Sequence, residues 1–498
     1  MTAADAVVRA ALPGGPNPSL GQRWRAAWQL GRSVRAAGTQ RTRDRWLAAA
    51  VAGAGTLGIA SVGIALMFTQ SEVESVADPS VGTAVAEGIA VVPSWQLAPY
   101  LVEPGLRAGV MAAALLLAVP VVVLVLQLVR FGAAARERRL AALILSGATR
   151  ADCRRIAVSE VLPAAMVGAL LAGPAYAVLL VLLGVMPPPG WKLLPPARPA
   201  LGAGWAAAAL VMIVVVAASS ARAGRAVDPS VVSPLGVVRR GPRPFRRRAL
   251  LVPIGYLLAA VAGFMLARVD GLRDLATLTF PLGLAGAAIT TGPAIMVLLG
   301  RRRLRSPDVA ERIVGRRLVA DPWTPGRVAG VLLACGVTLA VCLVGSASLV
   351  QDNLHGGEYD LGFYLGGFAL AGAATVVVAV VAAASMMSGT VEQVLDSRRP
   401  TASLVALGAS QHLVESLVAR QLRAAAVPPC VAGAVLGWVA TGLIFRLGVE
   451  PIGWPVWLTL PAAVIVAGGL AWLAATVVSR VLRGEVSAAA SIENLRTP

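Results

Sequence analysis

Long apolar runs follow one another along most of this chain, and short polar segments separate them. Each run holds roughly 20 residues, which is enough for a helix to cross the hydrocarbon core of a bilayer. A transmembrane β-barrel would show shorter segments of alternating polarity instead. The pattern predicts an all-α polytopic membrane protein with ten spans, at about 46–68, 108–129, 158–183, 201–220, 249–266, 275–299, 328–350, 361–387, 424–445 and 456–478.

The spacing of the runs groups the spans as four, two and four. Two basic stretches, Gln22–Arg45 and Val309–Arg327, mix apolar residues with arginines and predict amphipathic helices on the inner membrane surface. The expected regions are a tail with a surface helix (1–45), a four-span unit (46–240), a linker with a two-span hairpin (241–300), a second surface helix (301–327) and a second four-span unit (328–498).

Charge placement gives the orientation. The chain is 57% hydrophobic and 14% charged, with a net charge of +19, so its arginines need an explanation. They concentrate in the loops on one side of the apolar runs, as the positive-inside rule predicts for cytoplasmic loops. We therefore expect a multi-pass protein of the cell membrane with both termini in the cytoplasm. The bilayer explains the charge, and no nucleic-acid partner is needed.

One polar segment occurs twice, at 136–160 and 397–421, always 261 residues apart. In each copy an apolar stripe at helical spacing ends at a glycine, which predicts a short amphipathic helix and a tight break. Thr149, with Asp152 three residues on, then predicts a capped second helix. The repeated positions are Arg138, Leu143, Gly147 and Ala148 in the first copy, and Arg399, Leu404, Gly408 and Ala409 in the second.

Several kinds of chemistry are absent from the sequence. It has no G-x-x-x-x-G-K-[ST] phosphate-binding loop, and its two histidines, His355 and His412, fall on opposite sides of the predicted membrane. No predicted span carries an acidic residue at mid-depth, which argues against proton- or sodium-coupled transport. The acidic residues around His355 fit a solvated loop better than a metal site. We expect no catalytic site, metal or cofactor in this chain.

The doubled segment resembles a family pattern. FtsX-like permeases, the membrane subunits of MacB-type ABC transporters, carry R-x-x-x-x-L-x-x-x-G-A-[ST] between the second and third spans of a four-span unit, as at 138–149 and 399–410 here. The ten-span arrangement is similar to the BceB-like antimicrobial-peptide permeases. Those relatives carry large extracellular domains, whereas the outer segments here, Thr69–Pro104 and Gln351–Asp360, are short.

The resemblance implies that this chain works with a separate enzyme. Each loop would dock on one copy of a cytoplasmic ABC ATPase subunit, so two copies would serve one permease, and ATP and Mg would bind to those subunits. The short helix would be the coupling helix. The implied contact residues are Glu137, Arg138, Arg139, Leu143, Gly147, Ala148, Arg398, Arg399, Leu404, Gly408 and Ala409.

We expect such a permease to export or extract a hydrophobic or amphipathic compound, such as an antibiotic, a peptide or a lipid, which would make it an efflux or antibiotic-resistance protein. Two alternatives stay open: relay of ATP hydrolysis to an outer partner without transport, and an ATP-independent channel. The loop copies also differ, because Glu137, Leu140 and Glu160 become Arg398, Thr401 and Gln421. We interpret these differences as tolerated drift; unequal docking sites are the alternative.

Overall fold

The helices of the chain form two units, one made of 1–240 with 265–278 and the other of 241–264 with 279–498. The structure is a computed structural model with side chains. It describes residues 19–35, 38–65, 67–69, 91–92, 97–102, 104–130, 132–145, 147–185, 192–195, 199–225, 245–266, 273–354, 361–448, 457–491 and 493.

Within the described residues, nine helices are long and apolar enough to cross a membrane. This confirms the all-α polytopic class. The expected fifth span corresponds to α10 (Leu251–Leu266), which has 16 residues and follows the 3-10 turn η3 (Arg247–Leu250). It falls short of the length of the other nine, so the arrangement of ten spans as four, two and four stays a prediction.

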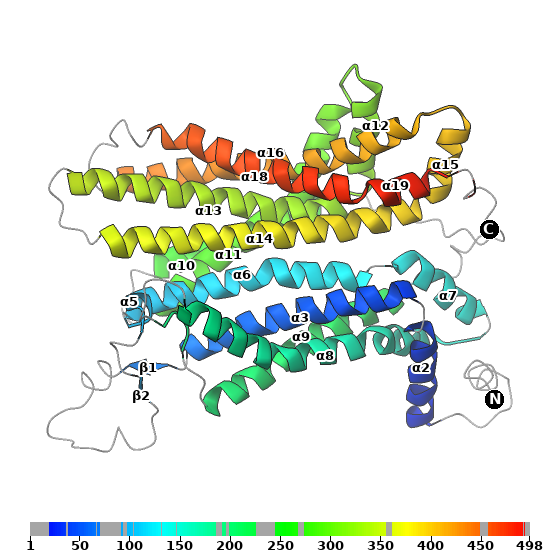
Figure 1. Ribbon diagram of the computed structural model, residues 1–498, viewed down its shortest axis with the longest axis horizontal. Helices are drawn as coiled ribbons and strands as arrows, with labels where there is room; N and C mark the ends of the chain where they lie inside the picture. Colours follow the sequence, from blue (N-terminus) through cyan, green and yellow to red (C-terminus); the bar gives the residue numbers. More distant parts are fainter. Residues whose placement is uncertain are drawn as a thin grey trace. The chain divides into compact units, whose positions relative to one another are not determined.

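In the first unit α3 (Gly38–Ala65) packs against the other three long helices, α6 (Pro104–Arg130), α8 (Arg150–Val185) and α9 (Pro199–Arg225). Figure 1 shows these four helices running alongside one another, with α2 (Leu20–Arg35) and α7 (Ala133–Leu145) at one end of them. The helices of this bundle approach closely: a Cβ at Gly168 of α8 would clash with the Ala48 carbonyl of α3. Small residues at such contacts are typical of helices packed in membranes.

A small group of non-helical contacts lies at the opposite end of this bundle. The two-residue strands β1 (Phe68–Thr69) and β2 (Val91–Val92) pair in parallel, and the short helix α5 (Pro99–Val102) precedes α6. Arg107 of α6 donates to the carbonyl oxygens of Leu101 (2.8 Å), Met67 (3.1 Å) and Val102 (3.3 Å). The guanidinium therefore satisfies the free carbonyls where α3 and α5 end.

The first predicted surface helix is wrong in its extent. We expected it to continue to Arg45, but α2 ends at Arg35 and residues 38–45 form the first turns of α3. The segment has no proline after Gly38 to end a helix. Its buried Arg43 pairs with the neighbouring Asp44 at 2.8 Å, so the polar turns are stabilised within the helix.

The second predicted surface helix is also too long. We expected Val309–Arg327, but α12 ends at Ala320 and α13 (Trp323–Leu354) begins three residues later. Pro322 disfavours helical geometry at the residue before it. Asp321 then caps α13, because its Oδ1 accepts from the Trp323 amide at 3.3 Å. Its Oδ2 also accepts from the Thr324 hydroxyl at 2.7 Å.

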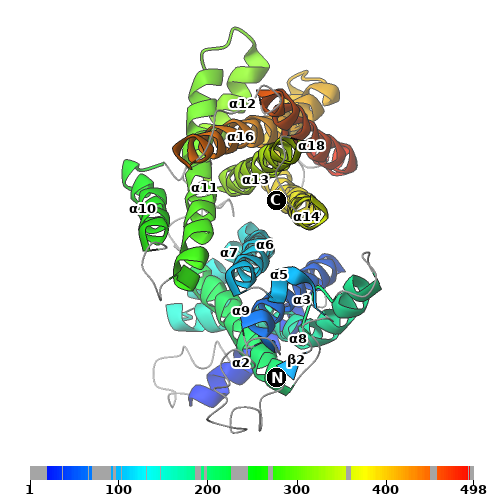
Figure 2. The ribbon, with the colours of Figure 1, turned by 90° about the vertical axis from the view of Figure 1, so that its left-hand side faces the viewer.

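The second unit contains a similar bundle of four long helices. These are α13, α14 (Leu361–Asp396), α16 (Gln411–Gly448) and α18 (Thr459–Val481). The hairpin of α10 and α11 (Arg273–Arg303) accompanies them: Figures 1 and 2 both show α10 beside α11. Close backbone contacts attach α11 to α13, because a Cβ at Gly330 would clash with the backbone of Ile289.

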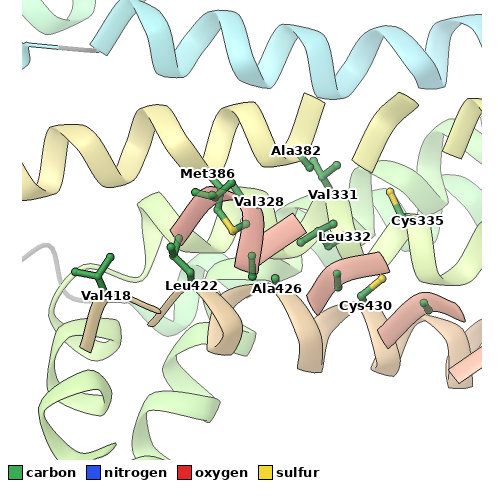
Figure 3. Packing of buried hydrophobic residues seen from close by; sticks show 14 of the residues in the cluster. Val328, Val331, Leu332, Cys335, Ala382, Met386, Val418, Leu422, Ala426 and Cys430 are labelled. Atoms are coloured by element: carbon green, nitrogen blue, oxygen red, sulfur yellow. The ribbon is translucent and has the colours of Figure 1, made fainter. Parts of the chain in front are cut away.

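The core of the second unit is built on the pair α13 and α16. Two contacts three residues apart join their backbones: a Cβ at Gly336 would clash with the Cys430 carbonyl oxygen, and one at Gly433 with that of Leu333. Figure 3 shows the apolar side chains that surround this contact, with Val331, Leu332 and Cys335 from α13 and Ala426 and Cys430 from α16. α18 completes the core with a stripe of four fully buried alanines, Ala463, Ala467, Ala471 and Ala475.

Candidate functional site

The first loop has the predicted helix, break and helix. α7 ends at Leu145, and Gly147 follows with a φ of +100°. The Gly147 amide donates to the Ile144 carbonyl (3.0 Å), and the Ala148 amide donates to that of Leu143 (2.8 Å). These two bonds define a Schellman motif. Its glycine adopts a left-handed backbone, and the amide of the residue after the glycine donates to the carbonyl of the third residue from the helix end.

The second loop has the same geometry. α15 (Arg398–Ala406) ends before Gly408, which has a φ of +96°. The Gly408 amide donates to Val405 (2.9 Å) and the Ala409 amide to Leu404 (3.0 Å). The L-x-x-x-G-A part of the repeated pattern is thus the sequence of a Schellman motif.

The last position of the pattern caps the following helix. The Asp152 amide donates to the Thr149 hydroxyl oxygen and the Thr149 amide to Asp152 Oδ2, each over 3.2 Å. This reciprocal pair is the predicted capping box of α8. In the second loop the Leu413 amide donates to the Ser410 hydroxyl oxygen over 3.2 Å, so α16 keeps one half of the box.

Each repeated segment, 136–160 and 397–421, contacts the amphipathic helix that precedes the four-helix bundle of its unit. In the first unit Ala27 of α2 is buried with Leu140, Cys153 and Ile156 of the loop. The Ser159 hydroxyl donates to the Ala27 carbonyl oxygen at 2.8 Å. The position 261 residues later is Arg420, which forms ion pairs with Asp308 and Glu311 at the start of α12. The same repeat position therefore binds the amphipathic helix in both units. Ser159 of α8 does so with a hydrogen bond to α2, and Arg420 of α16 does so with ion pairs to Asp308 and α12.

A buried ion pair joins the first loop to its spans. Arg136 of α7 and Glu160 of α8 are 3% and 2% exposed, and Arg136 Nε lies 2.9 Å from Glu160 Oε2. Arg139 Nη2 approaches the other carboxylate oxygen at 3.4 Å, and Arg136 Nη1 donates to the Val129 carbonyl of α6 at 3.1 Å. Burial lowers the pKa of Arg136, while the Glu160 charge acts in the opposite direction.

The tip of each loop exposes leucine side chains. Leu145 is 68% exposed, Leu404 44% and Leu407 84%. These residues lie at the ends of α7 and α15, outside the candidate spans. In the second loop the two exposed leucines lie three residues apart. Exposed apolar side chains grouped in this way are typical of a protein-binding site.

The predicted contact residues divide between the surface and the interior of the loops. Arg398 and Leu404 are exposed, whereas Ala148 is buried and supports the break. Glu137, Arg139, Leu143 and Ala409 are half-buried, and Gly147 and Gly408 form the two breaks. Arg138 and Arg399 lie in α7 and α15, and their side chains are outside the described set.

Sequence reasoning missed the two most exposed leucines of the loops and the ion pair. Leu145 and Leu407 are not in matching positions of the repeat, so the constant spacing did not select them. Glu160 stands just inside an apolar run, and a carboxylate there needs a cation. That requirement, with Arg136 at the start of the loop, was the available signal.

No group of three or more His, Cys, Asp or Glu residues is placed to hold a metal ion in the described part of the chain. Of the acidic residues around His355, Asp352 lies in α13, whereas His355 itself and residues 356–360 lie outside the described part.

Comparison with known protein families finds a match at two places in the chain. A sequence profile described as FtsX-like permease C-terminal matches residues 111–226 and 372–485. Each match begins inside the helix that leads into a loop and includes the two spans that follow it. No curated protein and no solved structure matches the chain.

Proposed function

Since this chain is an FtsX-like permease that carries the family's domain twice, we propose that it couples ATP hydrolysis by two separate ABC ATPase subunits to the movement of a hydrophobic or amphipathic compound out of the membrane. FtsX-like permeases partner with ABC ATPases in general, and the chain is an ABC transporter membrane subunit on this ground. The cargo, the direction of movement and the number of ATPase subunits are part of the proposal.

The repeated loop is the observation that carries the proposal. Two Schellman breaks with φ near +100° hold two short helices, α7 with one exposed leucine at its end and α15 with two. A helix of this kind, attached to the next span by a single tight turn, passes the movement of a docked protein to that span. Two such helices in one chain match two copies of one ATPase subunit.

Composition supports an apolar cargo. Each candidate span contains an 18-residue window with at most two charged residues. A charged cargo needs fixed opposite charges along its path, because a charge at membrane depth is costly without a partner. By analogy with exporters of apolar compounds, we include efflux and antibiotic resistance in the proposal, with the loops facing the cytoplasm of the cell membrane.

Co-purification from the native membrane tests the ATPase coupling. The chain is expected to retain an ATPase subunit. The double variant Leu145→Asp/Leu407→Asp is expected to release it, because docking would bury the new carboxylates in an apolar contact and remove their hydration. Val309→Asp is the matched control, since Val309 is an apolar residue of α12 that is 59% exposed outside the loops. Retention by the double variant, or loss by the control, would contradict the docking role of the leucine tips.

A transport assay distinguishes export of a compound from signal relay without transport. Vesicles containing the chain and its ATPase, loaded with an amphipathic fluorescent dye, are expected to move the dye only with ATP. Coupled ATP hydrolysis without any dye movement, together with loss of function when the outer segment Thr69–Pro104 is shortened, would favour the relay. Full activity of a Gly147→Leu, Gly408→Leu variant would favour an ATP-independent channel.

A further inference from the structure

The buried ion pair of the first loop has been exchanged as a pair in the second. The positions 261 residues after Arg136 and Glu160 hold Ser397 and Gln421. Both charges are absent together, so neither an arginine nor a carboxylate stands without the other at these two positions. This is the outcome that the energetics favour, because removing one member of a buried pair costs more than replacing both.

The pair connects three helices in the first unit. Arg136 belongs to α7, its carboxylate partner to α8, and the Val129 carbonyl that it also binds to α6. α7 therefore moves relative to α6 and α8 only if charge-assisted hydrogen bonds break in a site where both side chains are almost fully buried. Such bonds are stronger than those between neutral groups.

The second unit has a neutral contact and empty space at the same place. Gln421 Nε2 donates to Gln393 Oε1 of α14 over 2.9 Å. A cavity of about 20 Å³ lies beside them, large enough for one water. One charged residue, Arg317, lines it together with the neutral polar residues Thr390, Gln393, Ser397, Thr401 and Gln421. The cavity gives the neutral side chains of Ser397, Thr401 and Gln421 room to rearrange without breaking an ion pair.

We propose that Arg136 and Glu160 are positioning residues that make the first coupling loop rigid, and that the second loop yields more easily because Ser397, Gln421 and the adjacent cavity replace them. The two ATPase docking sites then transmit movement to their spans unequally. This inference rests on the proposed function for its consequence, but the difference in rigidity is a property of the chain alone.

Amide hydrogen exchange of the purified full chain in lipid nanodiscs tests the rigidity without any ATPase. The double variant Arg136→Ser/Glu160→Gln gives the first loop the residue pair of the second. Its α7 amide hydrogens are expected to exchange about tenfold faster than those of the parent chain. The reciprocal variant Ser397→Arg/Gln421→Glu is expected to slow exchange in α15. Unchanged exchange in both variants would overturn the proposal.

Folding controls accompany these variants. Glu160→Gln alone leaves a buried arginine without its carboxylate. It is therefore expected to lower the unfolding temperature more than the double variant Arg136→Ser/Glu160→Gln does. Glu160→Asp keeps the charge and is expected to restore part of the slow α7 exchange. If Arg136→Ser/Glu160→Gln does not fold, hydrogen exchange in the reciprocal variant of the second unit still tests whether this residue pair sets the rigidity of the loop.

ATP hydrolysis by the subunit that co-purifies with the chain tests the consequence. Arg136→Ser/Glu160→Gln is expected to reduce the maximal rate of ATP hydrolysis about tenfold. The ATPase concentration at half-saturation is expected to change less than about twofold. A loop that only maintains the fold would shift both values. Equal turnover in the parent chain and the variant would contradict unequal transmission, whereas failure of any ATPase to co-purify would contradict the proposed function and leave the exchange result standing.

Discussion

The Ala148 amide donates to the Leu143 carbonyl oxygen at 2.8 Å, and the matching Ala409 amide donates to Leu404 at 3.0 Å. The two bonds explain why a leucine, a glycine and an alanine recur at constant spacing. The leucine is the third residue from the end of its helix, the glycine takes the left-handed position, and the alanine follows it. The preserved element of the repeat is thus a turn that fixes how the short helix joins the span.

Replacing the glycine of this turn is expected to weaken the break. Gly147→Ala places a side chain at a φ of +100°, which costs about 1–2 kcal/mol. Exchange of the amides around the turn should accelerate about tenfold or more, as measured by mass spectrometry. Gly184→Ala is the control, because Gly184 lies in α8 with no neighbour within 4 Å of an added Cβ. Equal effects of the two substitutions would show that the turn is not under conformational constraint.

The capping box of the first loop leads to a second prediction. Thr149→Ala removes the hydroxyl that accepts the Asp152 amide and is expected to cost about 1 kcal/mol of helix stability. Thr149→Ser keeps the hydroxyl and should retain most of that stability. Thermal unfolding of the three proteins in one detergent measures the difference. A serine variant as unstable as the alanine variant would assign the loss to the threonine methyl group instead.

The sequence predicted those parts of the loops that depend on neighbouring residues. The breaks at Gly147 and Gly408 and the Thr149–Asp152 capping box are local, so each is visible within a few positions. The profile match repeats the constant spacing, because its two segments begin at residues 111 and 372, which are 261 apart. The long apolar runs are local signals too, and they identified the nine long apolar helices found among the described residues. For this reason the fold class was predictable.

Long-range relationships were not predictable from the pattern. The Arg136–Glu160 pair joins residues 24 positions apart on two helices, and only their packing brings the charges within 2.9 Å. The extent of α3 was missed for a related reason: Arg43 is polar, but it is buried and paired with Asp44. A polar residue reads as surface when its partner is unknown.

The contact between α12 and α16 should weaken in acid. The Arg420 guanidinium, hydrogen-bonded to Asp308, holds the pKa of that carboxyl below its usual value, and the Ala310 amide contributes in the same direction. A carboxyl with a lowered pKa stabilises the folded state above the ordinary aspartate pKa of about 3.9. That contribution is lost as the pH falls through the lower, folded-state value.

Asp308→Asn isolates this effect, because asparagine still caps α12 without carrying a charge. The stability difference between the parent chain and the variant, from unfolding curves at several pH values, is expected to be present at neutral pH and to shrink below about pH 4. Because the pair is exposed, added salt should reduce the difference as well. A difference that stays constant from neutral pH to pH 3 would assign the loss to the cap geometry.

The glycine contacts between α13 and α16 give the last prediction. Gly336 faces the Cys430 carbonyl oxygen and Gly433 faces that of Leu333, so the two backbones touch at two places three residues apart. An added methyl group meets backbone atoms, which cannot rotate away as a side chain does. Gly336→Ala and Gly433→Ala are each expected to destabilise the second unit by about 1–3 kcal/mol.

The two losses should not add in the double variant. Once one methyl group has separated α13 from α16, the second finds space already open, since neighbouring sites are coupled. Gly372→Ala in α14 is the control, because an added Cβ there has no neighbour within 4 Å. Unfolding in mixed micelles of the four proteins measures the cycle. Strict additivity would show that each glycine adjusts locally and that α13 and α16 do not separate as rigid helices.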